Sequence, residues 1–220
     1  ARLRSRKGRE EKPFAVMFPD LAAVRAVARL SELEASWLAS SAAPILLLPL
    51  LAHGDLADQV APGLHAIGAM LPYTPLHHLL MARLRFPVIC TSGNSSEEPM
   101  AIAPAEAERR LGAIADVFLH HDRPIVRPVD DSVARPVGGR LLVLRRARGF
   151  APLPVPIGAS LPSVRALGGH LKNTVAWAHG RQIVVSQHIG DLDHPLALEA
   201  QARVVADFER LFEIRPVAVA

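Results

Sequence analysis

A cluster of hydroxyl and amide side chains follows a short apolar segment in the middle of the chain. Residues 87–90 (PVIC) are apolar, and Thr91, Ser92, Gly93 and Asn94 come directly after them. The change predicts a buried strand that ends in a hydrogen-bonding loop, called here the TSGN loop. Backbone N–H groups around a glycine, with these polar side chains, can surround a phosphate without placing a charge in the core. A strand end that simply turns also favours Ser, Gly and Asn, so the loop alone leaves both interpretations open.

Positive charge is concentrated in two stretches. Residues 1–13 contain six Lys or Arg and two Glu, and residues 139–150 contain four Arg and no acid. The whole chain carries a net charge of +4, so the rest of it is net acidic. Arg grips phosphate oxygens through bidentate hydrogen bonds, and Lys acts as a mobile point charge. The basic residues within 6–12 and 145–148 are therefore predicted to bind a polyanion such as a nucleotide phosphate or RNA, unless both stretches are solvated surfaces.

Apolar periodicity and turn signals predict an α/β chain that positions these groups. Four prolines and no charge in residues 151–163 predict a linker, and later strand-sized pieces are separated at residues 168–169 and 179–180. The beginning resembles the last turns of a helix and the end reads as an apolar strand, so we expect a fragment at both ends. The expected strands are 12–17, 44–50, 88–90, 115–121 and a hairpin around Gly138 and Gly139; the expected helices are 20–38, 76–84, 104–113 and 196–212.

Composition favours a reducing, aqueous compartment. The single cysteine, Cys90, cannot form an internal disulfide, and its apolar surroundings predict a core residue rather than a nucleophile. The longest apolar stretch, residues 43–52, is too short for a membrane span and contains proline. The polar, basic beginning shows no signal peptide. We therefore expect a cytoplasmic protein without a membrane partner.

Seven motifs in order carry a resemblance to a known family. KPFAVM, LPYTPLHHLL, TSGNSSEEP, HDRPIVRPVDDSV and LRRARG together resemble the YrdC-like domain of the hydrogenase-maturation carbamoyltransferases, the HypF family. GGHLKNT and SQHIGDL are similar to the start of that family's second catalytic domain, which has an actin/sugar-kinase fold. The resemblance implies a YrdC-like twisted mixed sheet with flanking helices, followed by the first strands and helix of the second domain. The implied division is 1–150 for the N-terminally truncated YrdC-like nucleotide-binding domain, 151–163 for the linker, and 164–220 for the C-terminally truncated second domain.

The resemblance also implies a function. Family members make carbamoyl-adenylate from ATP, with Mg²⁺, and carbamoyl phosphate, and pass the carbamoyl group to the C-terminal cysteine of a partner maturation protein. The residues carried over are Lys12, Thr74, His77 and Arg145 as catalytic; Lys12, Thr91, Ser92, Asn94, Ser132, Arg145 and Arg148 as nucleotide-binding; and Gly169, Lys172, Asn173 and Thr174 in the second domain's site.

Two other functions remain open on the sequence alone. Threonylcarbamoyl-adenylate synthesis for tRNA modification would use the same YrdC-like site, although the GGHLKNT segment argues against it. A double-stranded RNA-binding module would explain the basic stretches, but aromatic residues are only 5% of the chain and Phe150 alone interleaves the arginines.

No metal site is predicted. The family's zinc modules and the His-x-x-x-His pair of its second domain are absent from this sequence. His120 and His121 would point to opposite faces of a strand, which makes them a poor ligand pair. Asp130 and Asp131 either help to hold the Mg²⁺ of ATP or form a solvated acidic pair on a hairpin.

Overall fold

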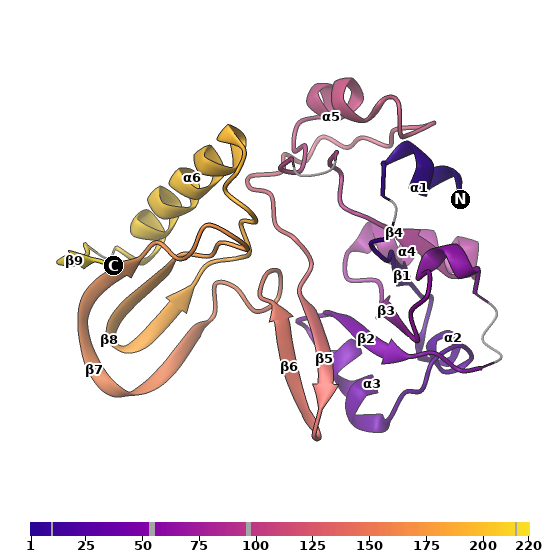
Figure 1. Ribbon diagram of the computed structural model, residues 1–220, viewed down its shortest axis with the longest axis horizontal. Helices are drawn as coiled ribbons and strands as arrows, with labels where there is room; N and C mark the ends of the chain where they lie inside the picture. Colours follow the sequence, from indigo (N-terminus) through magenta and orange to yellow (C-terminus); the bar gives the residue numbers. More distant parts are fainter. Residues whose placement is uncertain (10, 53–55, 96–97, 214) are drawn as a thin grey trace. The chain divides into compact units, whose positions relative to one another are not determined.

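A computed structural model describes residues 1–9, 11–52, 56–95, 98–213 and 215–220. The chain divides into two compact units, which are described separately below (Figure 1). The first unit contains Ala1–Ser92 and Asp131–Arg145, and the second contains Gly93–Asp130 and Arg146–Ala220. The TSGN loop therefore spans the point at which the chain passes from one unit to the other.

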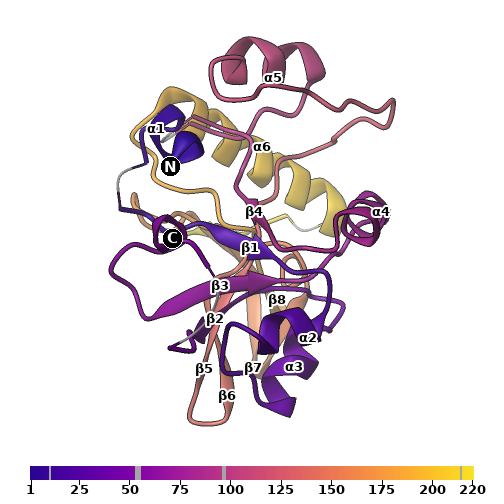
Figure 2. The same ribbon diagram turned by 90° about the vertical axis from the view of Figure 1, so that its right-hand side faces the viewer.

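A six-stranded mixed sheet forms the centre of the first unit (Figure 2). The first strand is parallel to the third, the second is parallel to the fifth, and the other neighbouring pairs are antiparallel. This arrangement confirms the predicted mixed α/β fold. In spatial order the strands are β4 (Val88–Cys90), β1 (Ala15–Met17), β3 (Ala66–Met70), β2 (Ile45–Pro49), β5 (Val133–Val137) and β6 (Arg140–Arg145).

Alternating side chains of the sheet build two apolar clusters, one on each face. Val16 belongs to a cluster with side chains of α2 (Leu21–Arg25) and α3 (Glu32–Leu38), whereas its neighbour Met17 packs with Met81 of α4 (Pro75–Leu84). This period of two is the expected behaviour of a strand covered on both sides. Two short elements complete the unit: helix α1 (Arg2–Arg6) and the 3₁₀ helix η1 (Asp58–Val60).

The single helix predicted for residues 20–38 is wrong, because two helices occupy this segment. Asp20 caps α2, as predicted, by accepting a hydrogen bond from the N–H of Ala23. Helix α3 then begins after Ser31, whose hydroxyl caps the N–H of Glu34 while the Glu34 carboxylate caps the N–H of Ser31. This reciprocal capping box starts a new helix, and its S-x-x-E spacing is visible in the sequence.

Strand β3 was missed by the sequence analysis because three of its five residues are Ala or Gly, which carry little strand signal. Its centre is Gly68, where a Cβ atom would lie 2.9 Å from Cγ2 of Ile45 on the neighbouring strand. A side chain at this position would require that neighbour to move. Close packing therefore favours glycine at position 68, and glycine is a residue that does not indicate a strand in a sequence.

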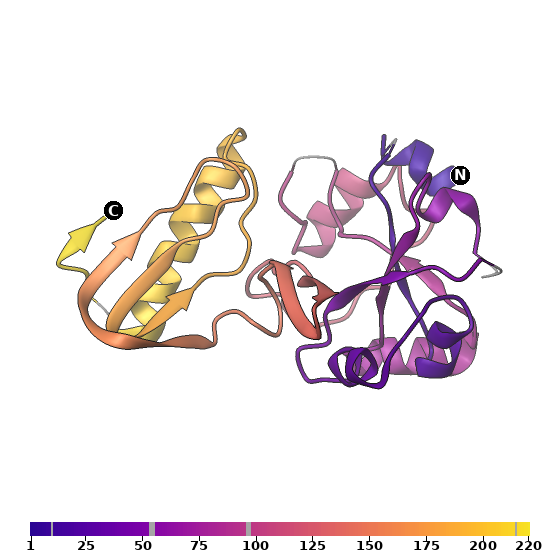
Figure 3. The same cartoon turned by 60° about the horizontal axis from the view of Figure 1, so that its bottom comes forward.

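The second unit pairs a long hairpin with one long helix (Figure 3). Strand β7 (Pro154–Ala166) lies between β8 (Ala176–Val185) and the short β9 (Ala218–Val219). Helix α6 (Pro195–Phe212) packs on this sheet through Phe208, whose ring stacks on Trp177 with 4.9 Å between centroids. Helix α5 (Pro104–Leu111) follows the TSGN loop. Among the described helices of the chain, none combines the length and apolar character that crossing a bilayer requires.

Three expectations for the second unit are wrong. Most of the predicted linker, residues 151–163, lies in β7, because register shifts after Pro156 and after Leu161 accommodate its prolines within the pairing to β8. Strand β8 continues through Gly180, whose φ of +57° marks an irregularity rather than an end. Residues 115–121 are not a strand, and Val117 is 83% exposed. The opposite-face argument against a histidine pair at 120–121 therefore does not apply.

Candidate functional site

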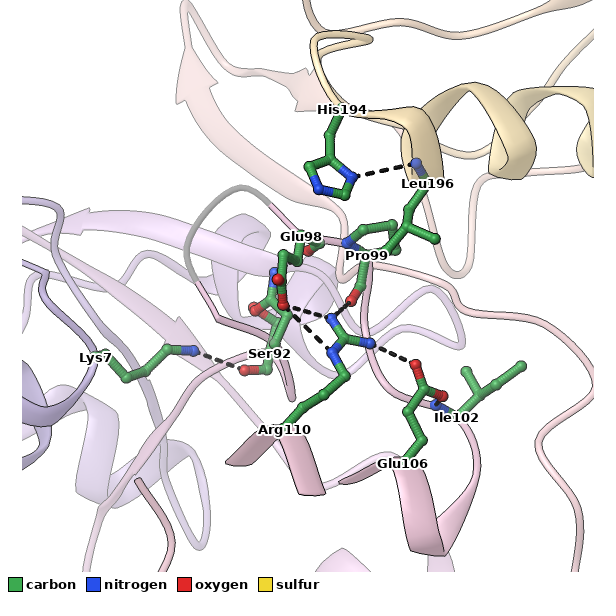
Figure 4. A network of polar contacts seen from close by, with 10 residues as sticks. Lys7, Ser92, Glu98, Pro99, Ile102, Glu106, Arg110, His194 and Leu196 are labelled. Carbon is green, nitrogen blue, oxygen red and sulfur yellow. Dashed lines mark hydrogen bonds and ion pairs between the residues drawn. The ribbon is translucent and has the colours of Figure 1, made fainter. Parts of the chain in front are cut away.

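Two basic side chains contact the start of the TSGN loop within the first unit. Lys7 is only 8% exposed, and its Nζ donates to the carbonyl of Ser92 at 2.8 Å and to Oγ1 of Thr91 at 3.2 Å. Figure 4 shows the contact between Lys7 and Ser92. Nη1 of Arg9 donates to the same Thr91 hydroxyl at 3.1 Å. One strand end therefore accepts hydrogen bonds from an ammonium and a guanidinium group.

The turn after α1 holds these two cations in place. Lys7 is the C-cap of α1, and Gly8 follows with a φ of +57°, a conformation that glycine adopts without strain. The guanidinium groups of Arg4 and Arg9 lie over the ring of Phe14, 4.8 and 4.9 Å from its centroid. Cation–π contacts of this kind keep a charged group at the surface of an apolar core.

Lys12 takes part in the same turn through its backbone. Its carbonyl accepts from Nη1 of Arg4 at 3.1 Å and from Nε of Arg9 at 3.2 Å. Its side chain is exposed. The lysine that contacts the loop is therefore Lys7, which the sequence predicted only as one of the basic residues within 6–12, whereas Lys12 was the lysine assigned to the site. Arg2, Arg4 and Arg6 have the same spacing, so no spacing within residues 1–13 singles out Lys7 and Arg9.

The cluster has a positive electrostatic field. Burial, followed by the charges of Arg9 and Lys12, lowers the pKa of Lys7. Burial, followed by the charges of Arg4 and Arg145, lowers the pKa of Arg9. Like charges that lower each other's pKa values are stabilised when an anion binds among them. Lys7, Arg9, Lys12 and Arg145 thus form what we call the cation cluster.

Two predicted residues lie at neighbouring strand ends: Ser132 directly precedes β5, and Arg145 is the last residue of β6. Arg145 pairs opposite Val133 at an irregular register, and its Nε donates to the carbonyl of Asp131 at 2.9 Å. Ser132 is fully buried, and its carbonyl accepts from the N–H of Ile45 at 2.8 Å. An irregularity of this kind is a common way for a sheet to redirect a side chain at its end.

The LPYTP motif lies at the other end of strand β1 from the TSGN loop. Ala15 pairs with Cys90, the residue before the loop, whereas Met17 pairs with Met70, from which the chain continues into the motif. The side chain of Thr74 caps α4 by accepting from the N–H of His77 at 3.1 Å.

The two neighbouring histidines of α4 have different surroundings. The ring of His77 packs edge-on against Tyr73, with 4.6 Å between centroids. His78 instead lines an open hollow of about 460 Å³. The hollow's other lining residues are Pro19, Asp20, Pro72, Met81, Ala82 and Arg85.

Two predicted nucleotide-binding residues belong to the second unit. Nδ2 of Asn94 donates to the carbonyl of Glu98 at 2.7 Å, which folds the segment after the TSGN loop back on itself. The N–H of Arg148 donates to the carbonyl of Asp130 at 3.1 Å. Nothing in these contacts assigns a ligand to either side chain.

The GGHLKNT and SQHIGDL motifs hold each other in the second unit. The N–H of Lys172 donates to Oδ1 of Asp191 at 2.6 Å, and Nε2 of His170 lies 2.6 Å from Oδ1 of Asp193. Asn173 is 1% exposed, and its Nδ2 donates to the carbonyls of Leu167 at 2.8 Å and Gly169 at 2.6 Å. The Asn173 amide is thus used to close the turn, whereas Gly169 and the Lys172 side chain lie exposed.

Gly168 allows this turn to close. Its φ is +72°, and a Cβ atom there would lie 2.1 Å from the carbonyl oxygen of Thr174. A Cβ on Gly169 would meet nothing within 4 Å. The first glycine of the pair therefore has a strict steric role, and the second leaves open space beside the backbone.

The described residues offer no protein-built metal centre. No group of three or more His, Cys, Asp or Glu side chains comes together in the part of the chain that the structure describes. His120, named in the sequence analysis, instead lies 2.8 Å from Oε1 of Glu108 through its Nε2.

Family models match nearly the whole chain. Residues 1–147 match the Sua5/YciO/YrdC family, described as "Telomere recombination", and residues 159–220 match the HypF Kae1-like domain. The carbamoyltransferase HypF of Synechocystis is 45% identical over 98% of this chain and 28% of its own length. That of Rhizobium leguminosarum is 44% identical over 97% of this chain and 29% of its own. The chain thus spans less than a third of these relatives.

Solved structures show the same likeness. Full-length HypF in a phosphate- and nucleotide-bound form aligns with 99% of this chain and 29% of that one, at 41% identity and a TM-score of 0.94. HypF of T. kodakarensis aligns with 98% of this chain and 28% of its own, at 36% identity and a TM-score of 0.91. Sua5 of P. abyssi, complexed with L-threonine, covers 66% of this chain and 43% of its own at 18% identity and a TM-score of 0.57, and shares the fold.

Proposed function

The chain belongs to the HypF family of carbamoyltransferases, and from this membership we propose that it binds ATP and forms carbamoyl-adenylate. Carbamoyl phosphate is the source of the carbamoyl group, and the final acceptor is the C-terminal cysteine of a partner hydrogenase-maturation protein. Mg²⁺ accompanies ATP and bridges its phosphate oxygens. The cation cluster at the TSGN loop is the observation that carries the proposal.

The first reaction yields two anions, pyrophosphate and carbamoyl-adenylate, so its site must stabilise negative charge. Water hydrolyses the carbamoyl–phosphate bond and gives carbamate and inorganic phosphate, which leaves. One oxygen of the carbamate then attacks the α-phosphorus of ATP. The bond from the α-phosphorus to the bridging oxygen of the β-phosphate breaks, and pyrophosphate leaves. The cysteine sulfur of the partner later attacks the carbamoyl carbon, gives up its proton, and expels AMP. Fixed cations lower the barrier of the first step by offsetting charge on the leaving pyrophosphate.

In this proposal each part of the first unit has a role. Lys7, Arg9 and Arg145 offset the phosphate charge, and Lys12 approaches with its mobile ammonium group. The Thr91 hydroxyl and the backbone of Ser92 contact phosphate or ribose oxygens, and the buried Ser132 supports this edge of the site. Thr74 and His77 lie toward the carbamoyl group at the other end of β1.

The second unit contributes its own residues to the proposal. Asn94 and Arg148 are the residues of this unit that we propose to contact a nucleotide. The exposed Gly169 and Lys172 belong to a site in which the carbamoyl group is passed on, and Asn173 and Thr174 shape its turn.

Calorimetric titration with ATP tests the proposal on this chain. Lys7→Ala removes a cation that contacts the loop, and we expect it to weaken binding about tenfold or more. Arg83→Ala is the control, because it removes one positive charge from an exposed position on α4 in the same unit. ATP binding that is equally affected by both variants, or no binding by the parent chain, would count against the proposed site.

Pyrophosphate release identifies the reaction. We expect release from ATP to depend on carbamoyl phosphate and to be indifferent to threonine. Stimulation by threonine with bicarbonate instead would assign the alternative product, threonylcarbamoyl-adenylate.

A further inference from the structure

Arg110, in the last turn of α5, donates hydrogen bonds to three neighbouring residues of the second unit. Its side chain is 17% exposed. Nη1 donates to Oε1 of Glu106 at 2.6 Å, and Nη2 donates to Oε2 of Glu98 at 2.9 Å and to the carbonyl of Pro99 at 2.6 Å. Nε adds a longer contact to Oε2 of Glu98 at 3.3 Å. Figure 4 shows these groups converging on one guanidinium, here called the Arg110 clasp.

The clasp fastens the segment that continues directly from the TSGN loop. The N–H of Ala101 donates to the carbonyl of Gly93 at 2.9 Å, so Ala101 lies beside the glycine of the loop. The carbonyl of Glu98 accepts from Nδ2 of Asn94 at 2.7 Å. Leu111 lies beside Gly93, with its Cδ1 3.7 Å from where a Cβ would stand. Glu98 therefore links the two residues: its backbone carbonyl accepts from Asn94, and its carboxylate accepts from Arg110.

Opposite charges strengthen the hydrogen bonds that Arg110 makes with Glu98 and Glu106. Although burial lowers the pKa of Arg110, its hydrogen bonds to Glu98 and Glu106 raise it overall, so the guanidinium stays charged. The hydrogen bond from Arg110 is also the largest cause that lowers the pKa of Glu106. The Glu106 carboxylate in turn accepts from the N–H of Ile102 at 3.4 Å, at the beginning of α5. Charge-assisted bonds arranged around one planar fork give both strength and a fixed orientation.

We propose that Arg110 is a positioning residue for nucleotide binding: it holds Glu98 and Pro99 so that the carbonyl of Glu98 orients the Asn94 side chain. The inference rests on the proposed function, because Asn94 is expected to contact the nucleotide. Arg110 itself touches no substrate in this proposal. A lysine in its place would keep the charge and lose the fork that joins two carboxylates and a carbonyl.

The test compares Arg110→Met with Arg109→Met in the whole chain. Arg109 is exposed on the same helix, so its replacement removes the same charge one residue away without touching the clasp. We expect Arg110→Met to weaken ATP binding about tenfold, as for loss of a charged hydrogen-bond partner, and Arg109→Met to change it less than about twofold. Arg110→Lys, which is gentler to the fold, should fall between them.

A double-mutant cycle separates positioning from general destabilisation. If Arg110 acts through Asn94, Arg110→Met adds little to the loss already caused by Asn94→Ala. Equal losses in the two backgrounds, or equal effects of the Arg109 and Arg110 variants, overturn the inference.

Amide hydrogen exchange, measured without nucleotide, tests whether Arg110 holds this segment in place. The result does not depend on the proposed function. We expect faster exchange at residues 93–95 and 98–101 in Arg110→Met and Arg110→Lys, with the other described residues of the second unit unchanged. If the parent chain binds no ATP while this local loosening is seen, the proposed function fails and the hold of Arg110 on the segment stands. Unchanged exchange in both variants refutes that hold.

Discussion

Replacement of Gly168 by alanine should destabilise the second unit more than any other single methyl group added to this turn. The residue has a φ of +72°, and the added Cβ would lie 2.1 Å from the Thr174 carbonyl oxygen. That distance is far inside any contact between real atoms, so the backbone must shift. The shift separates the turn from the Asn173 amide, which bonds Leu167 and Gly169.

The cost has two parts. A left-handed conformation costs a residue with a Cβ about 1–2 kcal/mol. Loss of the two Asn173 hydrogen bonds costs roughly 1 kcal/mol each. We therefore expect Gly168→Ala to lower the free energy of unfolding by about 3–4 kcal/mol. Gly169→Ala is the control, since its Cβ would meet nothing within 4 Å and its stability should change by less than about 0.5 kcal/mol.

Urea unfolding followed by tryptophan fluorescence measures the difference. Trp177 is buried in the second unit, and a Trp37→Phe background removes the only other tryptophan. The urea concentration at the midpoint of the Trp177 transition should be lower for Gly168→Ala than for the parent chain. It should be unchanged for Gly169→Ala. Equal midpoints for the two variants would refute the argument that the Gly168 contact closes this turn.

Three further predictions concern protonation and packing. Because the pKa of Lys7 is lowered from 10.5, ATP binding at alkaline pH should take up a proton, seen as a dependence of the calorimetric enthalpy on buffer and lost in Lys7→Met. Between that lowered pKa and 10.5 the unfolded chain binds more protons, so the Lys7 contribution to stability rises with pH. Burial, then the charge of Asp131, raises the pKa of the Cys90 thiol, so near neutral pH its alkylation should be slower than that of free cysteine and faster again in Asp131→Asn. Phe208→Ala should cost about 3–5 kcal/mol in the unfolding assay, whereas Leu211→Ala, at a side chain 54% exposed, should cost less than about 1 kcal/mol.

Each of these three predictions would be contradicted by a specific result. A Lys7 whose pKa is not lowered would give enthalpies independent of the buffer at alkaline pH. An alkylation rate unaffected by Asp131→Asn would remove that carboxylate from the surroundings of Cys90. Equal losses for the Phe208 and Leu211 variants would contradict the packing of α6.

Several helices, strands and turns were predicted correctly because turn residues or prolines mark their ends in the sequence. The apolar segment before the TSGN loop is strand β4, the hairpin turns at Gly138 and Gly139, and α4 and α6 each begin at a proline. The same reasoning failed where tertiary packing outweighs local pattern. Strand β3 contains Gly68 because Ile45 leaves no room, and the prolines of residues 151–163 lie in β7 because its pairing tolerates register shifts.

The candidate site shows the same limit. The basic stretch before β1 and the TSGN loop were both predicted to bind an anion, and the structure brings them together through Lys7 and Arg9. Which lysine reaches the loop depends on where α1 ends and how Gly8 turns, and charge counting does not contain that information. Thr74 and Asn173 were predicted as ligand-binding residues, yet their side chains also cap a helix and close a turn.

The order of the strands has a consequence for synthesis on the ribosome. Strand β2 receives β3 on one edge as soon as residue 70 has emerged, but its other edge pairs with β5, where Ile45 meets Val133. All of Gly93–Asp130, which belongs to the second unit, is translated in between. During that interval the nascent chain presents the edge of an Ile-Leu-Leu-Leu strand to its surroundings. Exposed apolar edges of this kind recruit other strands, so chains released before β5 should be captured by chaperones or aggregate.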